Sequence, residues 1–474
     1  MKIGVISLSI ILACSAQAAF AQPVHTQFLV GFKHPIAKNQ LQAASSSGYT
    51  VKWLNSTHAM FTMKQPQALA AQGKMNVVAL KQAWKIRLTH PNMRYVIPVN
   101  TRFYPLSIHA KYWPHQWDMH GENSIHVEDA WQNMASDVLY PVTVAVIDSG
   151  LGDKAPMDIV KRVKYGIHFE VSPYQQSIVW SYHFLDTAPR NSHGTHVAGT
   201  IMADGSYVMG VAGNLDAHLF HFEPVKVLGT NGGGIGAILA GVDWAIGTQP
   251  GQGFLPEDAP RNTHPAQVLN LSLGMSRINP QTGQPIMSMQ QWQQEVVSQF
   301  CPAWQEVVAR AHAKNMTLVF AAGNDGHDVS NDVPSGCTQL HSIIVEATTR
   351  SGYLTRYSTT STKQSAGTNT VIYAPGGERN SDGNGAADEI LSTLNGYPCT
   401  APHGNQPSKC FQQPYGYGYM QGTSMAAPHV AGIAALLYAM KPNATWHKIA
   451  DVLGSAFSNK GIVDAKKAVV AMHS

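Results

Sequence analysis

An aspartate, a histidine and a serine stand in three short stretches that would each present a polar side chain at the end of a buried element. Asp148 ends the apolar and β-branched run of residues 142–147, which predicts a buried parallel strand. His193 and Ser424 each lie in a polar turn that leads directly into an apolar helix. The free N–H groups and the dipole at a helix start favour developing negative charge, so Ser424 is a candidate nucleophile if a base takes its proton. By itself, Ser424 would be an ordinary helix-capping serine.

The order of these residues along the chain limits the class of serine hydrolase to which they could belong. Asp148, His193 and Ser424 follow one another as Asp, His and Ser, which differs from the orders found in chymotrypsin-like enzymes and in α/β-hydrolases. Residues 422–426 read Gly-Thr-Ser-Met-Ala and lack the second glycine of the hydrolase nucleophile elbow. The pattern predicts a serine hydrolase in which His193 is the base for Ser424 and Asp148 orients His193.

The stretches around these three residues resemble the Asp, His and Ser blocks of the subtilisin-like serine proteases, the subtilases. A fourth stretch agrees, because residues 318–325 read Leu-Val-Phe-Ala-Ala-Gly-Asn-Asp and resemble the segment that carries the family's oxyanion asparagine. The resemblance implies a secreted serine endopeptidase that works through an acyl-enzyme. It makes Asn324 the side-chain donor to the oxyanion, with the backbone N–H of Ser424 as the second donor. Asn324 also suits a turn, because Ala-Gly-Asn-Asp-Gly is a strong turn signal.

The resemblance covers residues 116–470, with insertions, and implies where a substrate binds. Two stretches resemble the walls of the family's P1 pocket, and a glycine run resembles the neighbouring strand. An extended peptide would pair its backbone with these edges. The substrate-binding residues expected on this basis are Gly232, Gly233, Gly234, Ser272, Leu273, Gly274, Ala321, Ala322 and Gly323. The glycine run is equally typical of a flexible loop, and the sequence does not specify the side chain that the pocket prefers.

Three other function classes compete with an active serine protease. A catalytically silent relative would act as a binding or scaffold protein, but all three triad positions and Asn324 are intact. Another serine hydrolase, such as an esterase, is disfavoured by the chain order and by the segment that precedes the catalytic region. A zinc hydrolase would need a third ligand and a carboxylate base, whereas only Gly and Thr stand between His193 and His196. We therefore expect no catalytic metal, and we expect His196 and His429 to be structural.

The chemistry is expected to need no cofactor, and a structural calcium ion is a separate question. Residues 382–388 read Asp-Gly-Asn-Gly-Ala-Ala-Asp, which places oxygen ligands at short spacing without the full twelve-residue calcium loop. Such a stretch is more usually a polar turn. Residues 174–191 hold Asp186 as their only acid, so the calcium loop that some subtilases have before the histidine is expected to be missing.

Predicted strands and helices alternate from residue 142 onward, which indicates an α/β fold with a parallel sheet and helices on both faces. The family resemblance makes this a subtilisin-like catalytic domain over residues 105–474. Residues 22–104 resemble an inhibitory prodomain, a small α+β unit of ferredoxin-like type. An unrelated N-terminal binding module is the alternative.

Three elements are predicted within the prodomain. Residues 27–33 alternate like a strand, residues 76–88 have helical spacing, and residues 93–98 form a final strand. The resemblance implies that the proenzyme processes itself, at a bond somewhere in residues 100–111.

The N-terminus predicts export. Residues 1–21 have a positive start, an apolar segment and a small-residue cleavage site at Ala19-Phe-Ala, as in a signal peptide. A lipoprotein signal ending at Cys14 is the alternative. Charged residues make up 13% of the chain and the net charge is +4, without a Lys or Arg run, so neither nucleic acid nor membrane is an expected partner. We expect a secreted monomer (periplasmic in transit) that acts on proteins or peptides and is inhibited by its own prodomain.

Four cysteines remain after the signal segment, namely Cys301, Cys337, Cys399 and Cys410. An even number in an exported chain suggests two disulfides, for which three pairings are possible. Sequence proximity favours Cys399–Cys410, and the resemblance to secreted bacterial subtilases favours Cys301–Cys337.

Overall fold

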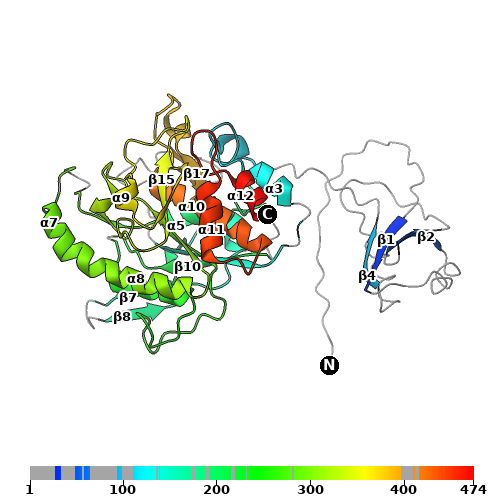
Figure 1. The fold of residues 1–474 in the computed structure, drawn as a ribbon, viewed down its shortest axis with the longest axis horizontal. Coiled ribbons are helices and arrows are strands. Elements are labelled where there is room, and N and C mark those ends of the chain that lie inside the picture. Colours follow the sequence, from blue (N-terminus) through cyan, green and yellow to red (C-terminus); the bar gives the residue numbers. More distant parts are fainter. Residues whose placement is uncertain are drawn as a thin grey trace. The chain divides into compact units, whose positions relative to one another are not determined.

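The computed structural model divides into two compact units, Met1–Ser107 and Ile108–Ser474, and each is described by itself (Figure 1). The residues that the structure describes are 27–33, 49–55, 58–63, 93–98, 110–134, 137, 139–172, 177–186, 192–214, 219–230, 232–279, 282–396, 409–410 and 416–473. The signal segment and most of the predicted processing region therefore lie outside the described residues.

The N-terminal unit contains a four-stranded antiparallel sheet with the order β2-β3-β1-β4. Its strands are β1 (Gln27–Phe32), β2 (Tyr49–Asn55), β3 (His58–Met63) and β4 (Met93–Pro98). β1 and β4 confirm the two predicted strands, whereas the β2–β3 pair was not predicted. The strand order is that of a ferredoxin-like sheet, but the helix expected at residues 76–88 lies outside the described residues. The ferredoxin-like architecture therefore stays a prediction.

An eight-stranded sheet forms the centre of the second unit and confirms the predicted α/β class. Its order is β16-β15-β13-β11-β5-β10-β7-β8, and every neighbouring pair is parallel except β7 and β8. The strands are β5 (Val142–Asp148), β7 (Ile167–Val171), β8 (Ile178–Ser181), β10 (Phe220–Lys226), β11 (Val268–Leu271), β13 (Thr317–Ala321), β15 (Ile343–Thr348) and β16 (Thr370–Pro375). The run of residues 142–147 that predicted a buried strand forms the middle of this sheet.

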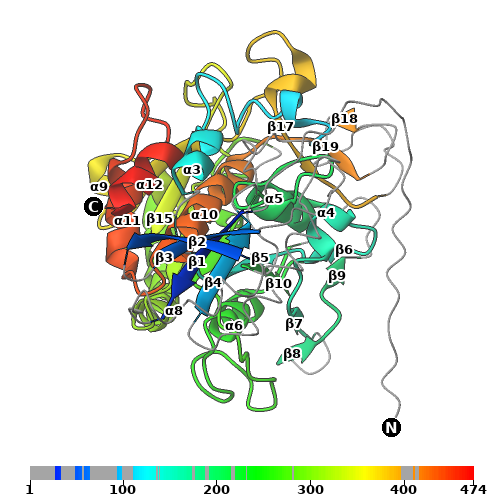
Figure 2. The ribbon, with the colours of Figure 1, turned by 90° about the vertical axis from the view of Figure 1, so that its right-hand side faces the viewer.

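Helices cover both faces of the sheet because its central strands are apolar on both sides. In β5, Val144 and Val146 belong to one hydrophobic core, and Ala145 and Ile147 belong to the other. The first core is completed by α3 (Val127–Met134), α5 (His193–Met202), α10 (Thr423–Met440), α11 (Trp446–Ser455) and α12 (Ala465–His473). The second is completed by α6 (Ile235–Ala245), the π-helical turn η3 (Trp292–Val297) and α8 (Ser298–His312). Figure 2 shows α3, α5, α6, α8, α10, α11 and α12 around the central strands.

Shorter elements connect these layers. Three small sheets are formed by β6 (Leu151–Gly152) with β9 (Leu185–Asp186), by β12 (Met275–Ser276) with β14 (Asp332–Val333), and by β17 (Ile390–Thr393), β19 (Tyr417–Met420) and β18 (Lys409–Cys410). The remaining short helices are α4 (Met157–Val160), α7 (Met289–Gln291), α9 (Lys363–Ala366), η2 (Trp113–His115), η4 (Val329–Asn331) and η5 (Gly385–Asp388).

Helix α10 is the central helix of the first core. It packs against β11, β13, β15 and β16 of the sheet and against α5. Among the described helices it is the one long and apolar enough to cross a membrane, but it lies entirely inside the protein. At Gly432 a Cβ would lie 2.5 Å from the Val211 Cβ, so this close packing requires glycine. Every residue of α10 except Ser424 is buried.

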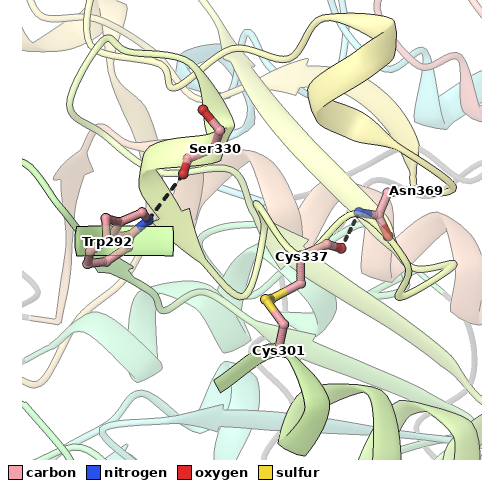
Figure 3. Close-up of a disulfide and its surroundings, with 5 residues drawn as sticks. All are labelled: Trp292, Cys301, Ser330, Cys337 and Asn369. Atoms are coloured by element: carbon pink, nitrogen blue, oxygen red, sulfur yellow. Dashed lines mark hydrogen bonds between the residues drawn. A yellow bond between two sulfur atoms is a disulfide. The ribbon is translucent and has the colours of Figure 1, made fainter. Parts of the chain in front are cut away.

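One disulfide joins the start of α8 to the loop that follows β14 (Figure 3). Cys301 and Cys337 are both buried with their Cα atoms 5.5 Å apart, which confirms this expected pairing. Asn369 donates a hydrogen bond to the Cys337 carbonyl at 3.0 Å. For a sequence separation of 36, the loss of chain entropy in the unfolded state gives a stabilisation of about 4 kcal/mol. Cys399 and the side chain of Cys410 lie outside the described part of the chain, so their pairing stays a prediction.

Candidate active site

The carboxyl edge of the central sheet gathers the four residues that the motifs singled out. Asp148 is the last residue of β5, and Asn324 follows β13 by three residues. His193 and Ser424 lie at the starts of α5 and α10, two helices that pack against each other. Ligand chemistry in open α/β sheets is usually located at this edge, because the strand ends and helix starts meet there.

His193 is held by a buried carboxylate. Its Nδ1 lies 2.9 Å from both Oδ1 and Oδ2 of Asp148, to which it donates. Asp148 is fully buried and also accepts the Ser149 N–H at 2.6 Å, whereas the His193 side chain is 27% exposed. Burial alone would lower the pKa of His193, but the charge of Asp148 and its hydrogen bond outweigh burial, so the pKa is raised. With Nδ1 protonated, Nε2 is the nitrogen that can accept a proton.

The glycine after this histidine allows α5 to approach β5. Gly194 donates its N–H to the Ser149 hydroxyl at 3.1 Å. A Cβ on Gly194 would lie 2.4 Å from the Gly150 carbonyl oxygen and 3.2 Å from Asp148 Oδ1. Any larger residue would therefore push the helix start away from the carboxylate, which explains the His-Gly pair of the motif.

Ser424 presents its hydroxyl at the start of α10. Its Oγ donates to the Ser272 carbonyl at 3.3 Å, and the Ser272 hydroxyl donates to the Ser424 carbonyl at 2.8 Å. Among the contacts of these described residues, no hydrogen bond joins Ser424 Oγ to His193. The structure thus joins Asp148 to His193, whereas the Ser424 hydroxyl donates to the Ser272 carbonyl instead of to His193. Such an arrangement is common in hydrolases without substrate.

Asn324 is oriented by the residue before Ser424. Its Oδ1 accepts both the N–H and the hydroxyl of Thr423, at 2.9 and 3.0 Å. Because these two bonds occupy the amide oxygen, Nδ2 is the end of the side chain that is available to donate. The turn role that the sequence allowed for Asn324 and a donor role are therefore compatible.

The backbone N–H groups in the first turn of α10 differ in whether they have a hydrogen-bond acceptor. Asn324 accepts the N–H of Thr423, and the Gly422 carbonyl accepts those of Met425 and Ala426 at 2.9 and 3.3 Å. The N–H of Ser424 is the remaining one in the first turn, and in the described contacts it has no acceptor. It is thus available beside the hydroxyl of the same residue.

A pocket of about 140 Å³ opens beside Ser424 and Asn324. Its lining residues are Leu273, Gly274, Ser276, Ala321, Ala322, Gly323, Asn324, Asp332, Ser335, Thr423 and Ser424. Five of the expected substrate-binding residues are in this set, and Ser272 adjoins it through its bonds to Ser424. The expected Gly232, Gly233 and Gly234 are not in the lining; they lie in the turn before α6, with Gly234 as its N-cap residue.

The lining residues Asp332 and Ser276 are a part of the pocket that the sequence analysis missed. Asp332 in β14 is paired with Ser276 in β12, and this two-stranded ribbon brings both residues to the pocket. Two-residue strands have no periodicity that could have indicated the pairing. Thr423 and Ser335 were also missed, although the position of Thr423 directly before Ser424 was a usable signal.

Two carboxylates lie close together here, Asp332 in the pocket lining and Asp325 behind the Thr359 hydroxyl. The Thr359 hydroxyl is 2.9 Å from Asp325 Oδ1 and 3.2 Å from Asp332 Oδ2, and the Ser276 hydroxyl donates to Asp325 Oδ2. Asp332 is only 4% exposed. Burial, followed by the charge of Asp325, raises the pKa of Asp332 to about 8, against smaller opposing effects of the Thr359 and Ser276 hydroxyls.

The two histidines expected to be structural, His196 and His429, have hydrogen-bond partners inside the protein. His196 is buried and its Nε2 donates to the Ile390 carbonyl at 3.0 Å, and burial lowers its pKa to about 3. His429 is bonded through Nδ1 to the Met425 carbonyl and through Nε2 to Asp118, both at 2.8 Å. Both therefore have the structural, hydrogen-bonded role expected of them. The described residues contain no group of three His, Cys, Asp or Glu side chains that could hold a metal ion.

The loop considered for calcium closes on itself. Asp388 accepts the N–H groups of Asp382 and Asn384 at 3.0 and 3.1 Å and the Asn384 side chain at 3.0 Å. Arg350 Nη1 lies 3.9 Å from the same carboxylate. A cation there would have to displace these donors, so the residues fit the polar turn better than a calcium site.

The comparisons with known proteins agree with this geometry. A model described as "Subtilase family" matches residues 141–468. The chain is 33% identical over 260 residues to an extracellular protease of Xanthomonas campestris, and 30% identical over 339 residues to subtilisin E of Bacillus subtilis. These matches cover 55% and 69% of this chain but 35% and 65% of the relatives. The chain thus spans about a third of the first relative's length and less than two thirds of the second's.

Solved structures give the same fold. A protease from Pseudoalteromonas arctica matches with a TM-score of 0.58 at 27% identity, over 77% of this chain and 100% of that one. The epidermin leader peptide processing serine protease from Staphylococcus aureus matches with a TM-score of 0.51 over 94% of this chain and 98% of its own. At 18% identity, the second match concerns the fold alone.

Proposed function

We propose that this chain, which belongs to the subtilase family, is a serine endopeptidase that hydrolyses peptide bonds through an acyl-enzyme. The observation that carries the proposal is the hydrogen bond between His193 and the buried Asp148, at the sheet edge where Ser424 and Asn324 share one pocket. No binding or scaffold role would require a buried carboxylate to orient a partly exposed imidazole beside that serine.

The proposed reaction begins when Ser424 Oγ leaves the Ser272 carbonyl and gives its proton to Nε2 of His193 while attacking the peptide carbonyl. Asp148 remains ionised and stabilises the imidazolium that forms. His193 then gives this proton to the leaving amine, and a water molecule repeats the sequence on the acyl-enzyme. The chemistry uses side chains and backbone N–H groups and needs no cofactor.

The negative charge that forms on the carbonyl oxygen needs fixed donors. Asn324 Nδ2 and the Ser424 N–H are the proposed pair, because the Thr423 bonds fix the first and the helix start frees the second. The substrate backbone would pair with residues 232–234 and 272–274 as an added strand. The pocket beside Ser424 would then receive the side chain that precedes the cut bond.

We further propose that the protease is exported and made as a self-processing proenzyme. Two relatives are named extracellular proteases, those of Xanthomonas campestris and Dichelobacter nodosus. Residues 1–21 would be the signal peptide and residues 22–104 the inhibitory prodomain, whose described sheet ends with the extended strand β4. Residues 105–474 would be the catalytic domain, working as a monomer on proteins and peptides.

The experiment compares wild type with Ser424→Ala, each exported from a host that lacks other extracellular proteases. Wild type should release a catalytic chain that begins near residues 100–111 and should hydrolyse casein. Ser424→Ala should stay joined to its N-terminal unit and be inactive. A matched control, Ser455→Ala on the exposed side of α11, should behave as wild type.

Two results would contradict the proposal in different ways. Casein hydrolysis by purified Ser424→Ala at the wild-type rate would show that Ser424 is not the nucleophile. Trimming of Ser424→Ala at the same bond as wild type would leave the nucleophile in place and assign the processing to another protease. Hydrolysis of esters without peptides would support the esterase reading.

A further inference from the structure

We propose that the pocket beside Ser424 takes a cationic side chain, lysine or arginine, from the residue before the cut bond, and that Asp332 selects it. This inference rests on the proposed peptidase function and adds its substrate class. It makes Asp332 a specificity-determining residue, separate from the residues that perform the reaction.

The position of Asp332 is the first argument. Its carboxylate lies against Gly323, where a Cβ would be 2.9 Å from Asp332 Oδ2 and 3.0 Å from its Cγ. Gly323 directly precedes Asn324, and all three residues line the same pocket as Ser424. A side chain whose carbonyl is held at Ser424 and Asn324 therefore enters a pocket that contains this carboxylate.

The rest of the pocket suits the stem of a long cationic side chain. Leu273, Ala321 and Ala322 provide apolar surface, and the hydroxyls of Ser276, Ser335 and Thr423 provide acceptors. Among the eleven lining residues Asp332 is the one with an ionisable side chain. The methylene groups of lysine or arginine can thus pack on the walls while the charged end reaches oxygen atoms.

No basic group within the described structure neutralises Asp332. The neighbouring Arg277 donates from Nε to Asn331 Oδ1 at 2.9 Å and from Nη1 to the Met287 carbonyl at 2.7 Å. His327 Nδ1 faces the other carboxylate, 3.8 Å from Asp325 Oδ1. The Thr359 hydroxyl, a neutral donor, is bonded to Asp332 at 3.2 Å. Among the described residues Asp332 therefore has no basic partner, whereas Asp325 has His327 beside it. A cationic substrate could supply that partner.

A guanidinium beside Asp332 would oppose burial and the charge of Asp325, the two effects that favour its protonated form. Burial and Asp325 raise the pKa of Asp332 to about 8, and a nearby positive charge favours the ionised form. The preference for arginine should consequently increase as the pH rises through this range. The other ionisable groups near Asp332 are Asp325 and His327, which faces Asp325.

The test uses peptides that differ only in the residue before the cut bond, which is arginine, its neutral isostere citrulline, or leucine. Wild type should have a kcat/KM for arginine about 10- to 100-fold above that for citrulline, the range expected for a charged hydrogen bond. Asp332→Asn should bring this ratio close to one while leaving kcat/KM for leucine within about threefold of wild type. Asp328→Asn is the matched control, because this carboxylate instead accepts from Ser330 N at 2.9 Å and from Ser365 at 2.8 Å.

The arginine-to-citrulline ratio of wild type should rise between about pH 7 and 9. Both substrates use the same His193, so its titration cancels in the ratio. The ratio also needs no variant, which keeps the proposal testable if Asp332→Asn does not fold. Equal rates for arginine and citrulline in wild type, or a ratio that Asp332→Asn leaves unchanged, would overturn the proposal.

A binding measurement separates this proposal from the proposed function. Benzamidine should bind the processed wild-type protein in calorimetry, its neutral analogue benzamide should not, and Asp332→Asn should weaken benzamidine at least about tenfold. Benzamidine binding without peptide hydrolysis by wild type would defeat the peptidase proposal and retain the cation pocket. Peptide hydrolysis without benzamidine binding would defeat the cation pocket and retain the peptidase proposal.

Discussion

Asp148 and Asp332 are two buried carboxylates at the same site, and they differ in what faces them. Asp148 faces His193, a group inside the protein that can become positive, and the two are joined at 2.9 Å. Asp332 faces a second carboxylate, Asp325, across the Thr359 hydroxyl. The first carboxylate therefore has its counter-charge within the chain, and the second has a place for a counter-charge that comes with the substrate.

This difference shows how one site can use separate carboxylates for the catalytic rate and for substrate selectivity. A carboxylate that stabilises an internal imidazolium acts in every turnover, whatever the substrate. A carboxylate that stabilises only an external cation acts on substrates that carry one. Substitution of each by its neutral isostere, asparagine, should thus have effects of different size and kind.

The largest effect is expected for Asp148→Asn. Asparagine would hold His193 in the wrong tautomer and leave the imidazolium unstabilised, so kcat should fall about 10⁴-fold, a magnitude carried over from chymotrypsin-like proteases. Steady-state kinetics should show the same loss for arginine, citrulline and leucine peptides. A loss confined to arginine peptides would erase the distinction between the two carboxylates.

A smaller effect is expected for Asn324→Ala. Loss of the Nδ2 donor should lower kcat by about 10²–10³-fold with little change in KM, a magnitude carried over from subtilisin. The control Asn384→Ala alters an exposed amide of the 382–388 loop and should leave both constants unchanged. An Asn324→Ala variant with wild-type kcat would show that the Ser424 N–H suffices as donor.

The smallest effect is a shift of the pH profile. His193 must be neutral to accept the proton, and its pKa is raised by Asp148, so kcat/KM should fall as the pH drops through that raised value. Asp148→Asn removes the carboxylate that raises the pKa of His193. The acid limb of the residual activity should therefore move to lower pH. Profiles measured with the leucine peptide should show no such movement in Asp332→Asn.

The sequence indicated the reacting residues because each belongs to a local pattern. A β-branched run ends in Asp148, and a polar turn precedes an apolar helix at both His193 and Ser424. The parallel sheet and its principal helices followed from the same periodicity. Asp332 could not be found in this way, because its place in the pocket depends on pairing with Ser276, 56 positions earlier, through strands of two residues.

Other features also depended on contacts that periodicity does not report. The β2–β3 pair and the antiparallel β7–β8 pair were not predicted. Ser424 Oγ donates to the Ser272 carbonyl. This contact depends on the rotamer of one side chain, which the sequence does not indicate. By contrast, the Cys301–Cys337 pairing came from the family resemblance, since spacing alone left three pairings open.

The central claim is that His193, oriented by Asp148, activates Ser424, and covalent labelling tests it most directly. Purified wild type should react with a fluorophosphonate, and peptide mapping by mass spectrometry should place one adduct on Ser424. His193→Ala should lose nearly all of this labelling, whereas Asp332→Asn should retain it. An adduct on another serine, or equally fast labelling of Ser424 in His193→Ala, would contradict the account.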